Sequence, residues 1–248
     1  MLPVNEPETQ EAIPPEALLT PLTAFEGSLG QKVYLSLKQA ILALVFKPGE
    51  ALRKPEICDR LGVSRSPVSE AVARLAGEGL VEVVPQAGTF VARFSMQEIR
   101  EGAFLREALE LAAVEMVAKT ITDEQIALLK RNLRVQEVLV ADGDQAGFYQ
   151  MDSQMHELIL SFTGFRRLAP IAETLWVQVN RARQLVLPRP GRLQATIKEH
   201  KAIIAALEAR EPYGARAATR AHLRQLVSLL EETAKQKPEL FADPVQRP

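Results

Sequence analysis

The hydrophobic pattern of this 248-residue chain changes its period twice, and these changes limit the folds that are open to it. Residues 28–76 place apolar side chains at helical spacing, whereas residues 80–92 carry two short runs of strand-forming residues. From about residue 96 onward the spacing is helical again, and we find no strand pattern there. The sequence therefore predicts a mainly helical protein, in which a small unit with a β-hairpin precedes an all-helical unit.

The N-terminal unit carries the signals of three helices followed by a hairpin. The expected helices are 28–46, 55–61 and 65–76, and the expected strands are 80–84 and 89–92. Pro48-Gly49 ends the first helix, Gly62 turns the chain after the second, and Ser64 offers a side-chain cap to the third. This order of elements is that of a winged helix-turn-helix.

A winged helix-turn-helix reads DNA with the N-terminal end of its third helix in the major groove. The residues that we expect to face DNA are Arg53, Lys54, Ser64, Arg65, Ser66, Ser69, Gln86 and Gly88. Arg65 suits a guanine edge or a phosphate, and Gly88 lies in the turn between the strands, where a positive φ is expected. Residues 25–93 hold nine Lys and Arg against seven Asp and Glu. This excess of positive charge is too small to show by itself that the segment binds DNA. The alternative is a winged helix that docks protein instead of DNA.

The second unit reads as a bundle of about six helices. Their expected ranges are 97–118, 122–141, 145–163, 166–187, 192–209 and 212–235. The connections are short, so neighbouring helices should pack roughly antiparallel. We therefore divide the chain into four parts: a disordered, proline-rich tail (1–24), a DNA-binding domain (25–93), a helical domain (96–235) and a flexible tail (236–248).

Composition points to the cytoplasm. The longest unbroken apolar run, Ala40–Phe46, has seven residues, whereas a membrane-spanning helix needs about 20. The N-terminus lacks the basic and apolar segments of a signal peptide. The only cysteine, Cys58, cannot form an intramolecular disulfide and is expected to be a small buried residue. We therefore expect a cytoplasmic protein with no membrane partner.

The only three histidines, His156, His200 and His222, lie on the predicted inner faces of three different helices. Asp152 precedes His156 by four residues, so the two share a helix face. A single histidine of this kind is most simply a core or surface residue. Three imidazoles and a carboxylate that meet in a helical core, however, form a site for a divalent cation, and Zn, Ni, Mn and Fe all accept such ligands.

Arg106 is a further inward residue of the first bundle helix. Its guanidinium could bind a carboxylate ligand through two parallel hydrogen bonds. The alternative is an ion pair with Glu110, four residues along the same helix. The sequence supports both interpretations equally.

The chain resembles the GntR superfamily of bacterial regulators, in the FadR-like branch with an FCD ligand-binding domain. The N-terminal motifs that carry the resemblance are Lys47–Glu50, Leu61–Val68, Arg74–Val81 and Gly88–Val91. The C-terminal motifs are Leu105–Glu110, Asp152-x-x-x-His156, Glu199–Ile203 and His222-Leu223. Together they span about residues 28–230.

The resemblance implies a homodimeric repressor, or less often an activator, that binds a palindromic operator. It also implies that Asp152, His156, His200 and His222 hold a metal ion, and that Arg106 helps a small carboxylate effector to bind beside it. Six helices resemble the VanR-type subgroup. No catalytic residues are implied.

Three positions depart from the family pattern. Ser69 replaces an arginine of the recognition helix, which puts the common operator sequence in doubt. Lys54-Pro55 stands where an acidic and a variable residue are usual. Thr163–Phe165 replaces a Ser-Gly-Asn turn after the first metal-binding helix, so a contact at the pocket edge is in doubt.

Two other functions use the same residues differently. A helical metallohydrolase or non-haem oxygenase could employ the four ligands, with Glu199 as the only adjacent acid for a general base. The position of Glu199 next to His200 is expected to point its carboxylate away from that ligand. The second alternative is a regulator whose effector pocket holds no metal.

Overall fold

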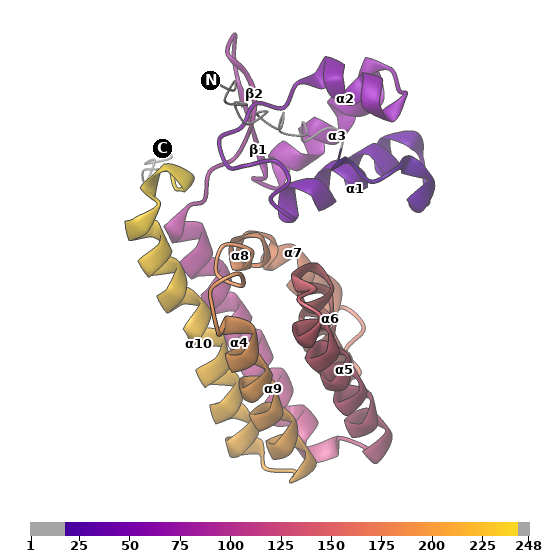
Figure 1. The fold of residues 1–248 in the computed structure, drawn as a ribbon. Coiled ribbons are helices and arrows are strands. Elements are labelled where there is room, and N and C mark those ends of the chain that lie inside the picture. The colour runs from indigo at the N-terminus through magenta and orange to yellow at the C-terminus, as the bar shows by residue number, and fades with distance from the viewer. Residues whose placement is uncertain (1–17, 243–248) are drawn as a thin grey trace, which may run out of the picture. The chain divides into compact units, whose positions relative to one another are not determined.

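The computed structural model describes residues 18–242 and divides the chain into two compact units, with the boundary between Ala92 and Arg93 (Figure 1). The first unit contains η2 (Leu22–Ala24), α1 (Leu29–Leu42), α2 (Lys54–Leu61), α3 (Arg65–Gly77), β1 (Val81–Val84) and β2 (Gly88–Val91). The second contains α4 (Met96–Thr120), α5 (Asp123–Ala141), α6 (Gln145–Ser161), α7 (Leu168–Leu175), α8 (Val177–Arg183), α9 (Arg192–Glu208), α10 (Pro212–Gln236) and η3 (Pro238–Leu240). The predicted winged helix-turn-helix and helical bundle are confirmed.

The first unit is built on the packing of α1 against α3. Val33 and Leu37 of α1, and Val68 and Leu75 of α3, have no exposed surface. β1 and β2 pair antiparallel in register from Val81↔Val91 to Val84↔Gly88. Gly88, expected in the turn, is instead the first residue of β2, and its φ of +131° confirms the expected positive value.

The first helix ends earlier than its hydrophobic pattern indicates. α1 stops at Leu42, because Leu44 adopts a left-handed conformation with φ +57°. The amides of Leu44 and Val45 then donate to the carbonyls of Ile41 and Ala40, which satisfies the last turn of the helix. Phe46, expected in the helix, is instead buried from the following loop.

The described parts of the two expected tails are folded, which corrects the prediction for those residues. Ser36 donates to the carbonyl of Thr20 over 2.8 Å, and Leu19 is buried. At the other end, the ring centroids of Phe241 and Phe94 are 5.6 Å apart. A few apolar side chains thus hold segments whose proline content predicts disorder. The rest of these tails, residues 1–17 and 243–248, lies outside the described residues.

The second unit packs its long helices along one another. Helix α10 contacts α4 and α9, and α5 contacts α6 and α9 (Figure 1). Fully buried residues at the centre include Val114, Leu129, Phe148 and Met155. Among the described residues, no helix is both long and apolar enough to span a membrane.

The expected helix 166–187 is the main departure from the predicted bundle. It is divided at Trp176, whose backbone leaves helical geometry with ψ 4°, into the short helices α7 and α8. The Trp176 indole is buried beside Ala113 and Leu160. This break brings the number of bundle helices to seven among the described residues.

Candidate functional site

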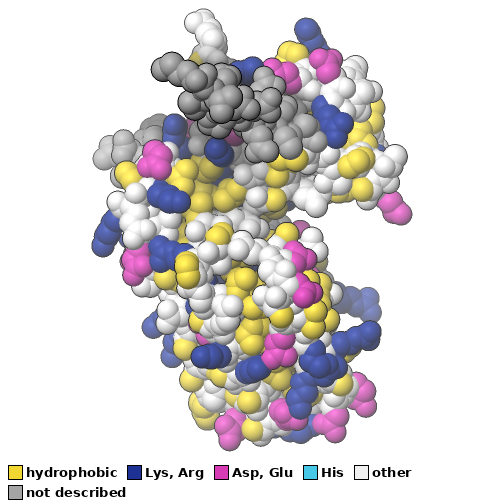
Figure 2. Space-filling view, in the orientation of Figure 1, with side chains coloured by type: hydrophobic (Ala, Val, Ile, Leu, Met, Phe, Trp, Pro, Cys, Tyr) yellow, Lys and Arg dark blue, Asp and Glu magenta, His cyan; other side chains and the backbone are white. Residues whose placement is uncertain are grey.

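Four buried polar side chains from three helices meet inside the bundle. Asp152 and His156 come from α6, His200 from α9 and His222 from α10, with exposed fractions between 0% and 7%. One potential ligand atom of each lies within 4.8 Å of the others. Among the described residues drawn in Figure 2, no histidine is visible on the face shown. The structure therefore brings together the four residues that the sequence singles out.

The outer nitrogen of each imidazole is held by an acceptor from another part of the bundle. The pairs are His156 Nδ1–Glu110 Oε2 (2.6 Å), His200 Nδ1–Gln136 Oε1 (2.8 Å) and His222 Nδ1–Glu199 Oε2 (2.7 Å). A proton on Nδ1 satisfies each acceptor, and the Nε2 atom of each ring then presents a lone pair to the centre. This is the arrangement by which proteins orient histidines that bind metals.

The inner atoms lack the partners that neutral imidazoles require. His222 Nε2 and His156 Nε2 face each other across 3.3 Å, so two lone pairs point at the same space. His200 Nε2 makes no hydrogen bond and lies 3.4 Å from Asp152 Oδ1. A divalent cation would satisfy all of these atoms, because imidazole nitrogen and carboxylate oxygen are its usual ligands. The site thus fits a metal ion; the donor set suits Zn, Ni, Mn or Fe.

Electrostatics favour the neutral form of His200 and His222. Burial, reinforced by the neighbouring histidines, holds the pKa of His200 well below its usual range. Burial also lowers the pKa of His222 to about 4, although Glu199 opposes the shift. Burial by itself raises the pKa of Glu110, but His156 and Arg106 reverse this and leave that pKa far below its usual range. The rings of His200 and His222 can therefore accept a cation at neutral pH without first losing a proton.

These shifts predict that the metal-free protein loses stability in acid. An unfolded histidine binds a proton near pH 6.5, whereas folded His222 does so only near pH 4, so the unfolded state gains protons first as the pH falls. The free energy of unfolding should therefore drop between about pH 6.5 and pH 4, by about 1.4 kcal/mol for each unit of difference. Urea unfolding in the presence of chelator, followed by the fluorescence of Trp176, measures it. A His222→Leu variant should show a smaller slope, and equal slopes would contradict this explanation.

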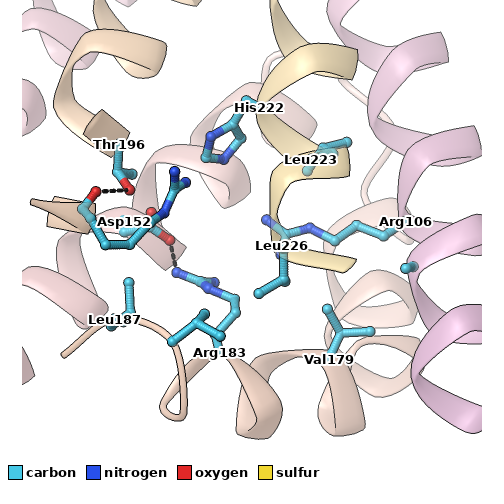
Figure 3. A pocket seen from close by; sticks show the side chains of 12 residues that line it. Arg106, Asp152, Val179, Arg183, Leu187, Thr196, His222, Leu223 and Leu226 are labelled. Carbon is cyan, nitrogen blue, oxygen red and sulfur yellow. Dashed lines mark hydrogen bonds and ion pairs between the residues drawn. The ribbon is translucent and has the colours of Figure 1, made fainter. Parts of the chain in front are cut away.

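A cavity with about 490 Å³ of empty space, part of it open to solvent, adjoins the cluster. Asp152 and His222 form part of its wall, together with Arg106, Arg183 and Arg192. Figure 3 shows Arg183 directed at Asp152, with which it forms an ion pair. Apolar side chains such as Leu223 and Leu226 complete the wall. The wall of the cavity therefore combines cationic and apolar side chains.

Arg106 fits both interpretations of the sequence, because it pairs with Glu110 and also lines the cavity. Its Nε donates to Glu110 Oε1 over 2.6 Å, and both side chains are buried. The same guanidinium lines the cavity and lies 5.0 Å from the ring centroid of Trp176. The i,i+4 ion pair and the position for ligand contact are thus compatible.

Sequence reasoning missed several residues around the cluster. Gln136 was detectable, because it occupies an inward position of a helix and follows the buried polar Asn132 by one turn. The side chain of Gln136 donates to Asn132 Oδ1, which directs its own oxygen to His200. Arg183 and Arg192 carried no such signal, since each lies in a segment with ordinary surface composition.

Glu199 has a different role from that of a general base. Its two oxygens accept from Arg192 over 2.7 and 2.8 Å, and one of them also holds His222. As expected, its carboxylate is not engaged with His200, the next residue. Because both oxygens are occupied in this way, Glu199 orients the ring of His222 from its outer nitrogen and does not face the centre of the cluster.

The residues expected to contact DNA lie on the first unit. Ser64, Arg65, Ser66 and Ser69 are exposed at the start of α3. Gln86 is exposed in the hairpin turn, and Gly88 is exposed at the start of β2. Arg53 is exposed and pairs with Glu56 at 3.1 Å, whereas Lys54 is half-buried. Ser64 occupies the N-cap position, but its side chain makes no capping hydrogen bond, contrary to our prediction. Its carbonyl instead accepts from the buried thiol of Cys58 over 3.6 Å.

Comparison with known families agrees with both units. Residues 29–91 match the bacterial regulatory proteins of the gntR family, and residues 101–225 match the FCD domain. The chain belongs to the GntR family, with an FCD domain. This GntR-family regulator is 27% identical over 215 residues to the HTH-type transcriptional repressor RspR of Escherichia coli strain K12, covering 87% of this chain and 94% of RspR.

Two further relatives of this GntR-family regulator cover most of its length. It is 32% identical over 210 residues to an HTH-type transcriptional regulator from an unstable DNA locus of Streptomyces ambofaciens, which covers 85% of this chain and 88% of that protein. The solved structure of Escherichia coli McbR/YncC has the same fold, with a TM-score of 0.72, 24% identity, and coverage of 84% of this chain and 99% of McbR. The relatives are transcription regulators, so this GntR-family member is a regulator and not an enzyme.

Proposed function

We propose that this protein is a ligand-responsive repressor, acting in the cytoplasm, that binds a palindromic operator as a homodimer. Residues 25–93 form its DNA-binding domain, and residues 96–235 bind a divalent metal ion and a small organic acid. The observation that carries the proposal is the convergence of three Nε2 atoms and Asp152 beside a cavity lined by arginines. The name of RspR, a transcriptional repressor, supports the direction of control.

The DNA-binding part of the proposal assigns base and phosphate contacts to exposed residues. Arg65 reads a base edge, while Ser64, Ser66 and Ser69 contact bases or phosphates near it. The second group contacts the DNA backbone; it comprises Arg53, Lys54, Gln86 and Gly88. The serine at position 69 leaves one cationic contact fewer than an arginine would provide, so the operator should differ from one read by that arginine.

Self-association is supported by an exposed apolar stripe on α4. Phe104 is 73% exposed and Leu105 is 38% exposed, and Ala108 lies one turn further along the same face. Exposed apolar patches of this kind commonly mark protein interfaces. A C2 dimer presents two recognition helices related by a two-fold axis, which calls for two half-sites in the operator.

The VanR-type assignment is also a proposal, supported by counting α7 and α8 as one helix interrupted at Trp176.

The metal would be held by Asp152, His156, His200 and His222 and would supply a Lewis acid for a carboxylate oxygen. Arg106 would pair with the same carboxylate, because its guanidinium lines the adjoining cavity. Effector binding can change DNA affinity only if the effector prefers one of two dimer conformations. A thermal-shift screen of small carboxylic acids with metal-loaded protein would identify candidates.

Replacing Arg65 by Ala is expected to weaken operator binding by about 1–3 kcal/mol, because the contact to a base edge is lost. The measurement is an electrophoretic or anisotropy titration with DNA from upstream of the protein's own gene or its neighbours. Arg134→Ala, which removes an exposed arginine from α5, serves as the control and should leave the affinity unchanged. Equal affinities of wild type and Arg65→Ala, or no sequence preference in wild type, would contradict the proposal.

A further inference from the structure

Three arginines of the cavity wall are each connected to one residue of the candidate metal site. Arg183 pairs directly with Asp152. Arg106 donates to Glu110, which holds His156, and Arg192 donates to Glu199, which holds His222. The three arginines therefore line the cavity and are connected to the site, Arg183 directly and the other two through a glutamate.

The paired side chains of this network carry no net charge. The three guanidinium groups are offset by the three carboxylates of Asp152, Glu110 and Glu199, and an imidazole that keeps its proton on Nδ1 and binds a metal through Nε2 adds no charge. All six charged side chains are buried or half-buried, with exposed fractions from 3% to 21%. A divalent ion adds two positive charges, and the three carboxylates that pair with the guanidinium groups do not offset them. An uncompensated buried charge is unfavourable, so negative charges on a ligand in the adjoining cavity would stabilise the loaded site.

We propose that the effector is a dicarboxylate, whose two carboxylates neutralise the loaded site by pairing with Arg106, Arg183 and Arg192 across the cavity. This inference deepens the proposed function and rests on its metal site. Arginine suits this task, because its planar fork can keep its bond to an internal carboxylate while its remaining N–H groups donate to a ligand. The apolar wall at Leu223 and Leu226 faces the carbon chain between the two acids.

The same connections couple the effector to the metal. A dicarboxylate that binds the three guanidinium groups holds the side chains that orient Asp152, His156 and His222, and so favours metal binding. By reciprocity, the metal must favour dicarboxylate binding by the same factor. Removing the ion abolishes the charge surplus, so the preference for a second carboxylate should then disappear.

The test compares succinate with butyrate, which has the same chain length but only one carboxylate. Calorimetry on the zinc-loaded full-length protein should give succinate an affinity at least about tenfold higher, the effect of one further charge-assisted contact. Glutarate and valerate provide a second pair of greater length. The same titrations in chelator should show no preference within either pair.

Variants of the arginines distinguish charge neutralisation from general damage. Arg192→Met and Arg183→Met each lower the charge surplus by one, so the succinate-to-butyrate ratio should collapse toward one. Arg224→Met removes an exposed arginine, paired with Glu107, and should keep the wild-type ratio. If either cavity variant fails to fold, the comparison of the loaded and metal-free wild-type protein still decides.

The possible results separate the inference from the proposed function. Wild-type protein that binds zinc but treats succinate and butyrate alike overturns the dicarboxylate assignment and leaves the metal site intact. Wild-type protein that binds no zinc overturns both, because the surplus charge comes from the ion. A preference for succinate that persists in chelator, or in both cavity variants, also overturns the inference.

Discussion

Replacing His200 by Ala is expected to reduce bound metal from one ion per chain to almost none. His200 is fully buried, and its Nδ1 is held by Gln136. Its Nε2 makes no hydrogen bond, so this atom is free to bind a metal ion. In the variant the metal ion keeps three ligands, which lie on α6 and α10, and loses the one that α9 provides. Metal analysis of protein purified without chelator measures the stoichiometry.

The same substitution should abolish stabilisation by metal. At a free metal concentration 100 times its Kd, binding stabilises the wild type by about 2.7 kcal/mol, and this increment should vanish in the variant. Lys201→Ala, which removes the exposed next residue of α9, is the matched control and should keep both the metal and the increment. Stoichiometric metal in His200→Ala would contradict the assignment of the site, and the absence of metal in wild type would favour an effector pocket without metal.

Replacing Glu110 by Ala is expected to destabilise the helical unit by about 3–5 kcal/mol. Glu110 is 2% exposed and neutralises Arg106, which is 3% exposed, while its second oxygen holds His156. The substitution leaves a buried guanidinium without its carboxylate, and a broken buried pair costs far more than a lost surface contact. Urea unfolding followed by Trp176, the only tryptophan of the chain, reports on this unit.

The neighbouring Glu107 provides the control for this experiment. It lies on the same helix and pairs with Arg224, whose side chain is 66% exposed. Exposed pairs contribute at most about 1 kcal/mol, so Glu107→Ala should unfold close to the wild-type midpoint. If Glu110→Ala and Glu107→Ala lower the free energy of unfolding by similar amounts, the buried network around Glu110 stabilises the protein no more than an exposed ion pair does.

Much of the fold was predictable because local patterns encode it. Helical spacing and the short β-type runs identified nearly all of the elements, and Gly88 marked the hairpin turn. Two predictions failed for reasons that a hydrophobic pattern does not contain. The end of α1 depends on the left-handed backbone of Leu44, and the division of helix 166–187 depends on the packing of Trp176.

The candidate site was predictable only in its central residues. His156, His200 and His222 are the only histidines, and helical periodicity predicted that each faces inward. Their partners were harder to find, because Glu110 and Gln136 lie 46 and 64 residues from the histidines that they hold. Such pairs depend on how far each helix is rotated and shifted against its neighbours.

The sequence by itself determined the order of the elements and the inward placement of Asp152 and the three histidines, since the period of a helix decides which side chains share a face. Only the tertiary structure decided which nitrogen of each ring faces the centre, because that depends on acceptors from other helices. The tertiary structure also decided that three arginines line one cavity, each connected to a different member of the site. Contacts between helices follow from packing, and packing is not periodic along the chain.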